Sequence, residues 1–151
     1  MAMGIGSFCV RDVVTVTRHA MIVDVAALMR RHHIGAVVIV NGNDASRVPV
    51  GIVTDRDIVV EIVAAGLDAG VVKVGELLQR PLTTVREEAG YAETVRVMAI
   101  NGIRRVPVVD ARGNLCGIIT LDDILRQLAA PLVALGDISI RERHYEMETR
   151  R

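Results

Sequence analysis

Two short stretches of the sequence each place a threonine and an aspartate three residues apart. Residues 51–59 read GIVTDRDIV and residues 117–125 read GIITLDDIL, so Thr54 and Asp57 recur as Thr120 and Asp123. A threonine followed three residues later by an acid is typical of a capping box at a helix N-terminus. The backbone N–H groups there also accept anions, and a nearby carboxylate can accept paired hydrogen bonds from sugar hydroxyls. The pattern therefore indicates a helix cap, a nucleotide site, or both at once.

The elements that position these residues also occur twice. Residues 15–40 align with residues 84–109, and the spacing between the copies changes only in the turn-rich loops 41–50 and 110–116. Each copy predicts a strand, a helix, two strands joined by a hairpin, and a second helix. The predicted strands are 14–16, 35–40, 50–54, 83–85, 104–109 and 116–120. The predicted helices are 23–33, 55–65, 92–101 and 121–130, with Gly66 and Pro131 as stop signals.

This order predicts an α+β fold built from two β-α-β-β-α repeats. The first repeat covers residues 8–66 and the second covers residues 83–131, with residues 67–82 as the linker. Residues 132–151 form a charged C-terminal tail, which fits a frayed helix, a disordered segment or an extension that contacts a dimer partner. A repeat of this size has a thin core by itself, so we expect the two repeats to pack face to face.

Composition and charge exclude several classes of function. Among 151 residues, 18 basic side chains balance 18 acidic ones, and Phe8, Tyr91 and Tyr145 are the only aromatics. Such a chain has no electrostatic reason to bind DNA or RNA and few rings on which bases could stack. The first residues do not resemble a signal peptide, and no apolar run approaches the roughly 18 residues of a membrane span. These observations predict a cytoplasmic protein without a nucleic-acid or membrane partner.

The remaining reactive residue types do not form a recognisable site. Cys9 and Cys116 have neither disulfide nor metal-ligand spacing, so both are expected to be reduced and structural. His32 and His33 are adjacent and lack cysteine or carboxylate partners at ligand spacing, which argues against a metal site. No serine, cysteine or histidine has the setting of a nucleophile. The sequence therefore predicts no catalytic residue, no metal and no cofactor.

The duplicated unit resembles a tandem pair of CBS domains, also called a Bateman module. The resemblance rests on GIVTDRD and GIITLDD after each hairpin and on IRRVPVVD at 103–110, and it covers roughly residues 8–130. It implies two repeats about a pseudo-twofold axis, with clefts between them that bind AMP, ADP, ATP or S-adenosylmethionine. In the family, each cleft combines the first strands of one repeat with the G-x-x-T-x-x-D segment of the other.

Carried onto this sequence, the resemblance implies two unequal clefts. The residues implied for the first cleft are Thr54, Asp57, Thr83, Ile103, Arg104 and Arg105. Those implied for the second are Val14, Ile34, Gly35, Ala36, Thr120 and Asp123. A guanidinium fork suits phosphate, so we expect a phosphorylated nucleotide in the first cleft, although the two arginines could instead form a solvated or ion-paired strand edge. The second cleft has no such charge, and VVIVN replaces the usual LPVVD, leaving a free N–H at Val38 where the family has proline.

The second helix of the first repeat carries more aliphatic residues than one core face needs. Ile58, Val59, Val60, Ile62 and Val63 fall within six positions, and Ile124, Leu125 and Leu128 form a narrower stripe in the other copy. A helix with two apolar faces packs inward and also against a partner. We therefore expect a homodimer, and the resemblance agrees; the alternative is that one chain covers both faces.

Together these observations predict a stand-alone regulatory module that binds adenine nucleotides and catalyses nothing. Binding would change how the repeats or subunits sit against each other, and an effector protein of unknown identity would respond. One alternative is a dimerisation scaffold whose threonine and aspartate residues only cap helices. Another is a small enzyme that acts on a nucleotide.

Overall fold

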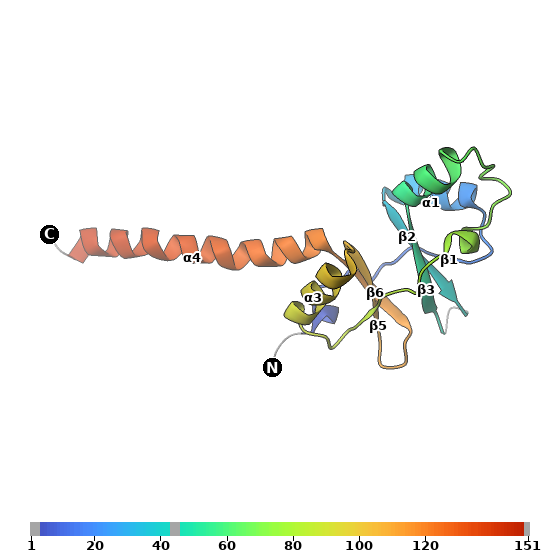
Figure 1. Cartoon of the computed structure of the whole chain (residues 1–151). Coiled ribbons are helices and arrows are strands. Elements are labelled where there is room, and N and C mark those ends of the chain that lie inside the picture. Colours follow the sequence, from blue (N-terminus) through green and yellow to red (C-terminus); the bar gives the residue numbers. More distant parts are fainter. Residues whose placement is uncertain (1–3, 43–45, 150–151) are drawn as a thin grey trace. The chain divides into compact units, whose positions relative to one another are not determined.

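The structure, a computed structural model, describes residues 4–42 and 46–149 (Figure 1). It divides into two units, Met1–Ile119 and Thr120–Arg151, each of which is described by itself. The first unit contains nearly all of both repeats, and the second is formed by one long helix that starts at the second threonine–aspartate motif.

The first repeat is a three-stranded sheet with helices before and after its hairpin. Strands β1 (Thr15–Thr17), β2 (Ala36–Asn41) and β3 (Val48–Thr54) lie in the order β1-β2-β3, with β1 parallel and β3 antiparallel to β2. Helix α1 (Ile22–His32) connects β1 to β2 and packs against β2. Helix α2 (Asp55–Ile58) follows β3 directly and continues as the π-helix η2 (Val59–Val63).

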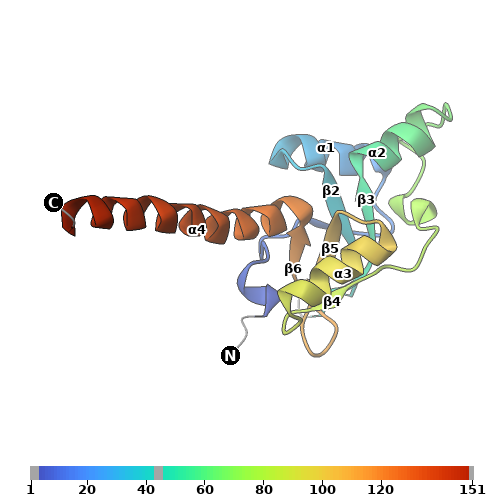
Figure 2. The same cartoon turned by 60° about the vertical axis from the view of Figure 1, so that its left-hand side comes forward.

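The second repeat follows the same plan. Strands β4 (Val85–Arg86), β5 (Arg105–Val109) and β6 (Leu115–Thr120) form a sheet in the order β4-β5-β6, with β4 parallel to β5. Helix α3 (Tyr91–Asn101) lies alongside β4 and β5 (Figure 2). The α+β fold class and the repeated element order are confirmed, and the predicted bounds of α1 and α3 are correct to within one residue.

Aliphatic side chains make the core, as the shortage of aromatic residues requires. In the first repeat Val37 and Ile39 of β2 pack with Ile22, Val25 and Met29 of α1, and with Ile62 of η2. Val38 and Val40 point the other way, into a second cluster with Leu115 from the other repeat. Strand β2 is therefore buried on both faces, which explains why it reads as the continuous apolar run VVIV.

The expectation of a free N–H at Val38 is wrong. That N–H donates to the carbonyl of Val14 at 3.2 Å, within the pairing between β1 and β2. The first repeat has valine instead of proline at this position, and the N–H of this valine forms a hydrogen bond within the sheet. The hydrogen bond holds the chain just before β1 against the middle of the sheet.

Each repeat is covered by the segment that precedes the other repeat. Before the first repeat, the N–H groups of Ile5 and Gly6 donate to the carbonyls of Ala89 and Glu87 at 2.8 and 2.9 Å. Before the second, Val74 and Gly75 donate to Ala20 and Arg18 at 2.8 and 3.0 Å. These partners occupy equivalent positions in the two copies, and the short 3₁₀ helices Ile5–Ser7 and Val74–Leu77 match in the same way.

The first glycine of each repeated motif makes room for these crossing segments. A Cβ atom at Gly51 would collide with the side chain of Leu78, and one at Gly117 would collide with Cys9 Sγ and approach the Val10 carbonyl to 3.1 Å. Val10 and Ile118 also exchange two backbone hydrogen bonds of 2.9 Å. The glycines in GIVT and GIIT are thus explained by close approach of the chain.

The helix that follows β3 begins at Asp55 as predicted and ends at Val63, two residues before the predicted end, and its second half is not α-helical. The Ala64 N–H bonds to the Val59 carbonyl at 2.9 Å, five residues back, which is the π-helical pattern. Gly66 then adopts a left-handed φ of 68°. The stop signal at Gly66 is therefore confirmed, since glycine takes this conformation without steric cost.

The stop signal at Pro131 is wrong. Helix α4 (Leu121–Thr149) runs through Pro131 without interruption and includes most of the tail that was expected to be frayed or disordered (Figure 1). Proline removes only one helical hydrogen bond, and the Gln127 carbonyl left without it lies on an exposed part of the helix where water can bind. Leucine and alanine on both sides are strong helix formers.

Cys9 and Cys116 are both thiols, and the environment of Cys116 suppresses its ionisation. Its thiol donates to the Val108 carbonyl at 3.4 Å. Burial raises the pKa of Cys116 to about 11, and the negative charge of Glu87 adds to the effect.

We expect Cys116 in the folded protein to react slowly with iodoacetamide at pH 8. A free cysteine has a pKa of about 8.5, so the thiolate fraction of Cys116 should be lower by a factor on the order of 100. The alkylation rate, followed by mass spectrometry, should rise steadily between pH 8 and pH 11 and should match that of glutathione after unfolding. A folded-state rate equal to that of glutathione at pH 8 would contradict the assignment.

Candidate ligand cleft

The threonine–aspartate motif forms a capping box in both copies. Asp57 Oδ2 accepts from the N–H and the hydroxyl of Thr54 at 2.8 and 2.7 Å, and the Asp57 N–H donates back to Thr54 Oγ1 at 3.1 Å. In the second unit Asp123 Oδ2 accepts from Thr120 at 2.9 and 2.6 Å, with a return bond of 3.2 Å. The capping interpretation is confirmed for both aspartates.

The two aspartates differ in their second carboxylate oxygen. Asp123 Oδ1 lies 3.4 Å from Arg126 Nη1 and forms an ion pair with it. Asp57 Oδ1 has no hydrogen-bond partner within residues 4–42 and 46–149. The cap therefore occupies one oxygen of Asp57 and leaves the other available to a ligand, so capping and ligand binding are compatible at this residue.

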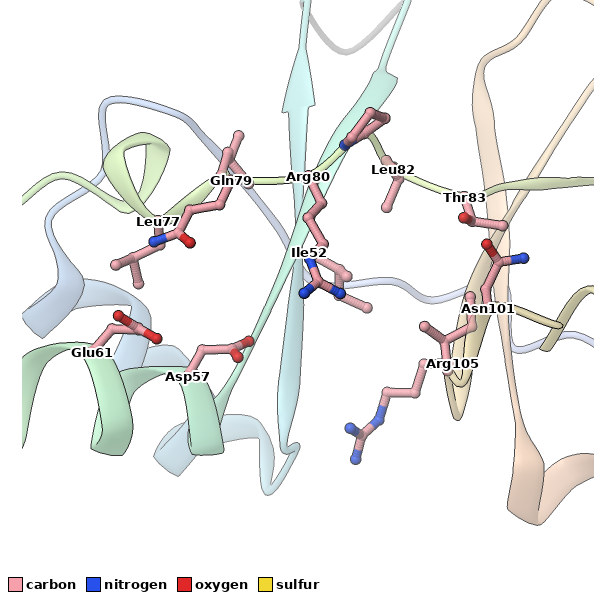
Figure 3. Close-up of a pocket in the computed structure, with 14 residues that line it drawn as sticks. Ile52, Asp57, Glu61, Leu77, Gln79, Arg80, Leu82, Thr83, Asn101 and Arg105 are labelled. Atoms are coloured by element: carbon pink, nitrogen blue, oxygen red, sulfur yellow. The ribbon is translucent and has the colours of Figure 1, made fainter. Parts of the chain in front are cut away.

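A cavity of about 460 Å³ lies beside Asp57 within the first unit (Figure 3). One wall comes from the helix after β3, with Asp57 and Glu61. The opposite wall comes from the second repeat and includes Thr83, Asn101 and Arg105. The segment between the repeats, with Arg80, closes a third side. Residues of both repeats thus line one space, as the resemblance implied for the first cleft.

Two guanidinium groups line this cavity without a protein partner. Neither Arg80 nor Arg105 forms a hydrogen bond or an ion pair with any part of the chain that the structure describes. In Figure 3 Arg80 points from the linker into the middle of the cavity, with Asp57 on one side and Thr83 on the other. An arginine that is unpaired beside a cavity is placed to bind an anion with both of its N–H arms.

Gly35 allows the Arg105 side chain to approach the first repeat. A Cβ atom at position 35 would lie 3.3 Å from Arg105 Nη2 and 3.2 Å from Asp55 Oδ2. The Gly35 carbonyl also accepts a 3.1 Å hydrogen bond from the Asp55 N–H. A larger side chain would therefore crowd both the arginine and the start of α2.

Four of the six residues predicted for the first cleft line the cavity: Asp57, Thr83, Ile103 and Arg105. Thr54 lies behind Asp57 and orients it through the capping box. Arg104 is exposed and does not line the cavity. Their roles in ligand binding stay predictions.

Sequence reasoning missed four polar residues on the cavity wall. Glu61 and Asn101 belong to helical segments, and Gln79 and Arg80 belong to the linker. No periodicity or repeat match singles out Arg80, because the linker has no regular element that fixes the direction of a side chain. Contacts with Gly51 and Arg18, which are distant in sequence, place this segment over the cleft.

The second predicted cleft divides between the two units. Val14, Ile34, Gly35 and Ala36 belong to the first unit, whereas Thr120 and Asp123 begin the second. Their association into one cleft stays a prediction.

The described part of the chain holds no group of three His, Cys, Asp or Glu side chains placed to bind a metal ion. Within residues 4–42 and 46–149, no helix is both long enough and apolar enough to cross a membrane.

His33 has a structural role that its sequence position did not suggest. It ends α1 in the left-handed region with a φ of 54°, where the equivalent Gly102 ends α3 with a φ of 62°. A residue at this C-terminal cap position normally is glycine. The histidine therefore terminates a helix.

The duplicated fold and the cleft between its repeats define a class of protein. The family model for the CBS domain matches residues 5–64 and again residues 74–130. The chain therefore belongs to the CBS domain family and carries two CBS domains, which confirms the resemblance seen in the sequence.

Individual relatives share most of this chain. Hypoxic response protein 1 of Mycobacterium tuberculosis is 39% identical over 116 residues, which make up 77% of this chain and 78% of that protein. Its crystal structure, with two coordinated zinc ions, has a TM-score of 0.72 at 36% identity and covers 82% of this chain and 97% of its own. An uncharacterized protein of Methanopyrus kandleri is 40% identical over 83% of this chain, but the match spans only 62% of that protein.

A second similar structure contains adenosine derivatives. The CBS domain pair of protein MJ0100, in complex with 5′-methylthioadenosine and S-adenosyl-L-methionine, has a TM-score of 0.71 at 25% identity. The match covers 83% of this chain and 98% of that one.

Proposed function

We propose that the cleft beside Asp57 binds a phosphorylated adenine nucleotide, AMP, ADP or ATP, and that the protein is a regulatory module without catalytic activity. The observation that carries the proposal is the cavity between the repeats, with an unpartnered carboxylate oxygen on one wall and two unpartnered guanidinium groups around it. In this arrangement Asp57 accepts hydrogen bonds from ribose hydroxyls, and Arg80 and Arg105 bind phosphate oxygens.

The size and lining of the cavity support this assignment. About 460 Å³ lies within the range of roughly 300–1,000 Å³ that is typical of small-molecule sites. Ile52, Leu77 and Ile103 supply aliphatic surface for a purine ring. The adenosine ligands of the MJ0100 domain pair support an adenosine compound in general. Two free arginines favour a phosphorylated form over S-adenosylmethionine, which has no phosphate.

We assign the predicted second cleft a weaker or less charged adenosine ligand. Its residues supply no cationic side chain, and Arg126 already pairs with Asp123.

The regulatory part of the proposal follows from linkage. A ligand can change the arrangement of repeats or subunits only if it binds one arrangement more tightly than another. Val59, Val60 and Val63 are exposed aliphatic residues on η2, and Leu125 and Leu128 are exposed on α4; each set by itself is a proposed contact of a homodimer. An effector protein would recognise the nucleotide-bound arrangement in the cytoplasm.

Replacing Arg105 by glutamine should weaken ATP, ADP and AMP binding by roughly 10- to 100-fold, the scale of losing hydrogen bonds to a charged group. Adenosine affinity should change by less than about 3-fold, because adenosine has no phosphate. Arg80→Gln should show the same selectivity. Isothermal titration calorimetry measures each constant, and Arg86→Gln, an exposed arginine outside the cavity, is the matched control. Equal losses for adenosine and ATP would contradict a phosphate role.

The capping boxes favour one alternative, a dimerisation scaffold in which both aspartates act only on their own helices. Under this alternative, millimolar AMP, ADP, ATP and S-adenosylmethionine would all leave the melting temperature unchanged. Under the proposal, at least one phosphorylated nucleotide raises the melting temperature.

The Arg104→Gln variant tests the predicted membership of Arg104 in the first cleft, since unchanged nucleotide affinity would remove Arg104 from that cleft.

A further inference from the structure

Glu61 is a charged residue of the cavity wall to which the proposed function assigns no role. It lies four residues after Asp57, and residues four apart share one side of a helix, so both carboxylates line the same wall. Glu61 forms no hydrogen bond or ion pair with any residue that the structure describes. Its carboxylate is therefore available to a ligand in the cavity.

The helical turn that carries Glu61 is irregular. Glu61 is the middle residue of the π-helix η2 (Val59–Val63), in which the Ala64 N–H bonds to the Val59 carbonyl at 2.9 Å. Such π-helical turns are rare and occur frequently at functional sites. The repeated fold does not require a carboxylate here, because the corresponding residue of the second repeat is Gln127, four positions after Asp123. The carboxylate is thus a feature of the first cleft alone.

The charges of the cavity are separated along its length. In Figure 3 Glu61 and Leu77 lie on one side of Asp57. The guanidinium groups of Arg80 and Arg105 lie on its other side. The ribose joins the base of a nucleotide to its phosphates. A nucleotide with its ribose on Asp57 and its phosphates on the arginines therefore directs its base toward Glu61, where aliphatic surface and a carboxylate occur together.

The carboxylate of Glu61 imposes a chemical requirement on that base. A carboxylate only accepts hydrogen bonds, so the edge of the base that faces it must carry an N–H group. Adenine has an amino group at C6, whereas hypoxanthine and guanine have a carbonyl oxygen there. An oxygen facing Glu61 would leave two acceptors without a donor, which a binding site rejects strongly. Gln79 lines the same end of the cavity, and its amide can donate to a ring nitrogen.

We propose that Glu61 accepts a hydrogen bond from the 6-amino group of adenine and makes the cleft selective for adenine over 6-oxopurines. The inference rests on the proposed function, because it requires a nucleotide whose ribose lies on Asp57. It adds the residue that distinguishes nucleotides with the same ribose and the same phosphate. Neither Asp57 nor the arginines can make that distinction, since they contact only the parts that such nucleotides share.

The test compares AMP with inosine 5′-monophosphate (IMP), which differs from AMP only in its 6-oxo group and N1 proton. In isothermal titration calorimetry of the full chain, the wild type should bind AMP at least about 10-fold more tightly than IMP. Glu61→Gln should reduce this ratio to about 3-fold or less, because a glutamine amide can accept from the 6-amino group and can equally donate to the 6-oxo group. Far-UV circular dichroism reports whether the variant keeps the fold.

Glu93→Gln is the matched control, because Glu93 is an exposed glutamate on α3 outside the cavity. Its ratio of AMP to IMP affinity should stay within about 2-fold of the wild-type ratio. Equal binding of AMP and IMP by the wild type, or an unchanged ratio in Glu61→Gln, would overturn the role of Glu61 and leave the proposed function intact. Absence of AMP, ADP and ATP binding by the wild type would overturn both, so the two failures give different results.

Discussion

Replacing Asp57 by alanine is expected to weaken binding of the phosphorylated nucleotide by about 1.5–3 kcal/mol, or roughly 10- to 150-fold. The carboxylate has one oxygen engaged by Thr54 and one without a partner in the described part of the chain, and the second is available to ribose hydroxyls. Hydrogen bonds to a charged acceptor beside a cavity are stronger than those between neutral groups. Isothermal titration calorimetry with ATP, ADP and AMP measures the change.

The same substitution also removes a helix cap, so the control must reproduce that loss. Asp123→Ala breaks an equivalent capping box with nearly the same distances and leaves the cavity beside Asp57 unchanged. Each variant should lose about 0.5–2 kcal/mol of stability. Only Asp57→Ala should lose affinity for the phosphorylated nucleotide. Unchanged affinity in Asp57→Ala would remove this residue from the site, and equal losses in both variants would assign the effect to capping.

Replacing Ile39 by alanine is expected to lower the free energy of unfolding by about 2–5 kcal/mol, the largest effect on stability that we predict. Ile39 is 0% exposed in the middle of β2 and packs in the aliphatic cluster of the first repeat. The loss combines the transfer of buried methyl groups with the cavity left behind, since no flexible aromatic side chain is present in that cluster to fill it. Urea unfolding followed by circular dichroism measures the change in midpoint.

Ile100 provides the matched control for this substitution. It is 74% exposed on α3, so Ile100→Ala removes the same atoms from the surface and should change stability by less than about 0.5 kcal/mol. Alanine is also the better helix former, which acts in the opposite direction to any loss of packing. Similar destabilisation by the two variants would show that Ile39 is not part of the cooperative core.

Much of the fold is predictable because local signals and the duplication agree. The helix that starts after Thr54 is fixed by a capping box within four residues, and its end is fixed by the positive φ of Gly66. A hairpin of changed length appears where the two copies differ in spacing. The continuation of α4 through Pro131 was not predictable from a single stop signal, because several strong helix formers outweigh one missing hydrogen bond. The π-helical turn at Val59–Val63 likewise has no marker in the sequence.

The candidate site is predictable only where a repeated motif supplies it. Asp57 and Arg105 lie on elements with a defined start, and Thr83 lies two residues before β4, so their positions follow from the repeat. Arg80 lies in a segment whose path depends on contacts with Gly51 and Arg18, which are distant in sequence. Such contacts have no local pattern. The sequence therefore predicted the carboxylate wall of the cleft and one of its two arginines.

The reciprocal crossing of the segments before each repeat has a consequence for how such a chain could have arisen. An ancestor with one copy would have carried the same segment but no second repeat on which to lay it. The surface over Gly51 would have been covered only by the corresponding segment of another ancestral molecule. The carbonyls of Arg18 and Ala20, which now accept from the amides of Gly75 and Val74, would have been bonded by that same segment. Two identical chains would therefore have exchanged these segments with each other. Gene duplication would then have joined two exchanging molecules into one polypeptide, converting an association that depends on concentration into an intramolecular one.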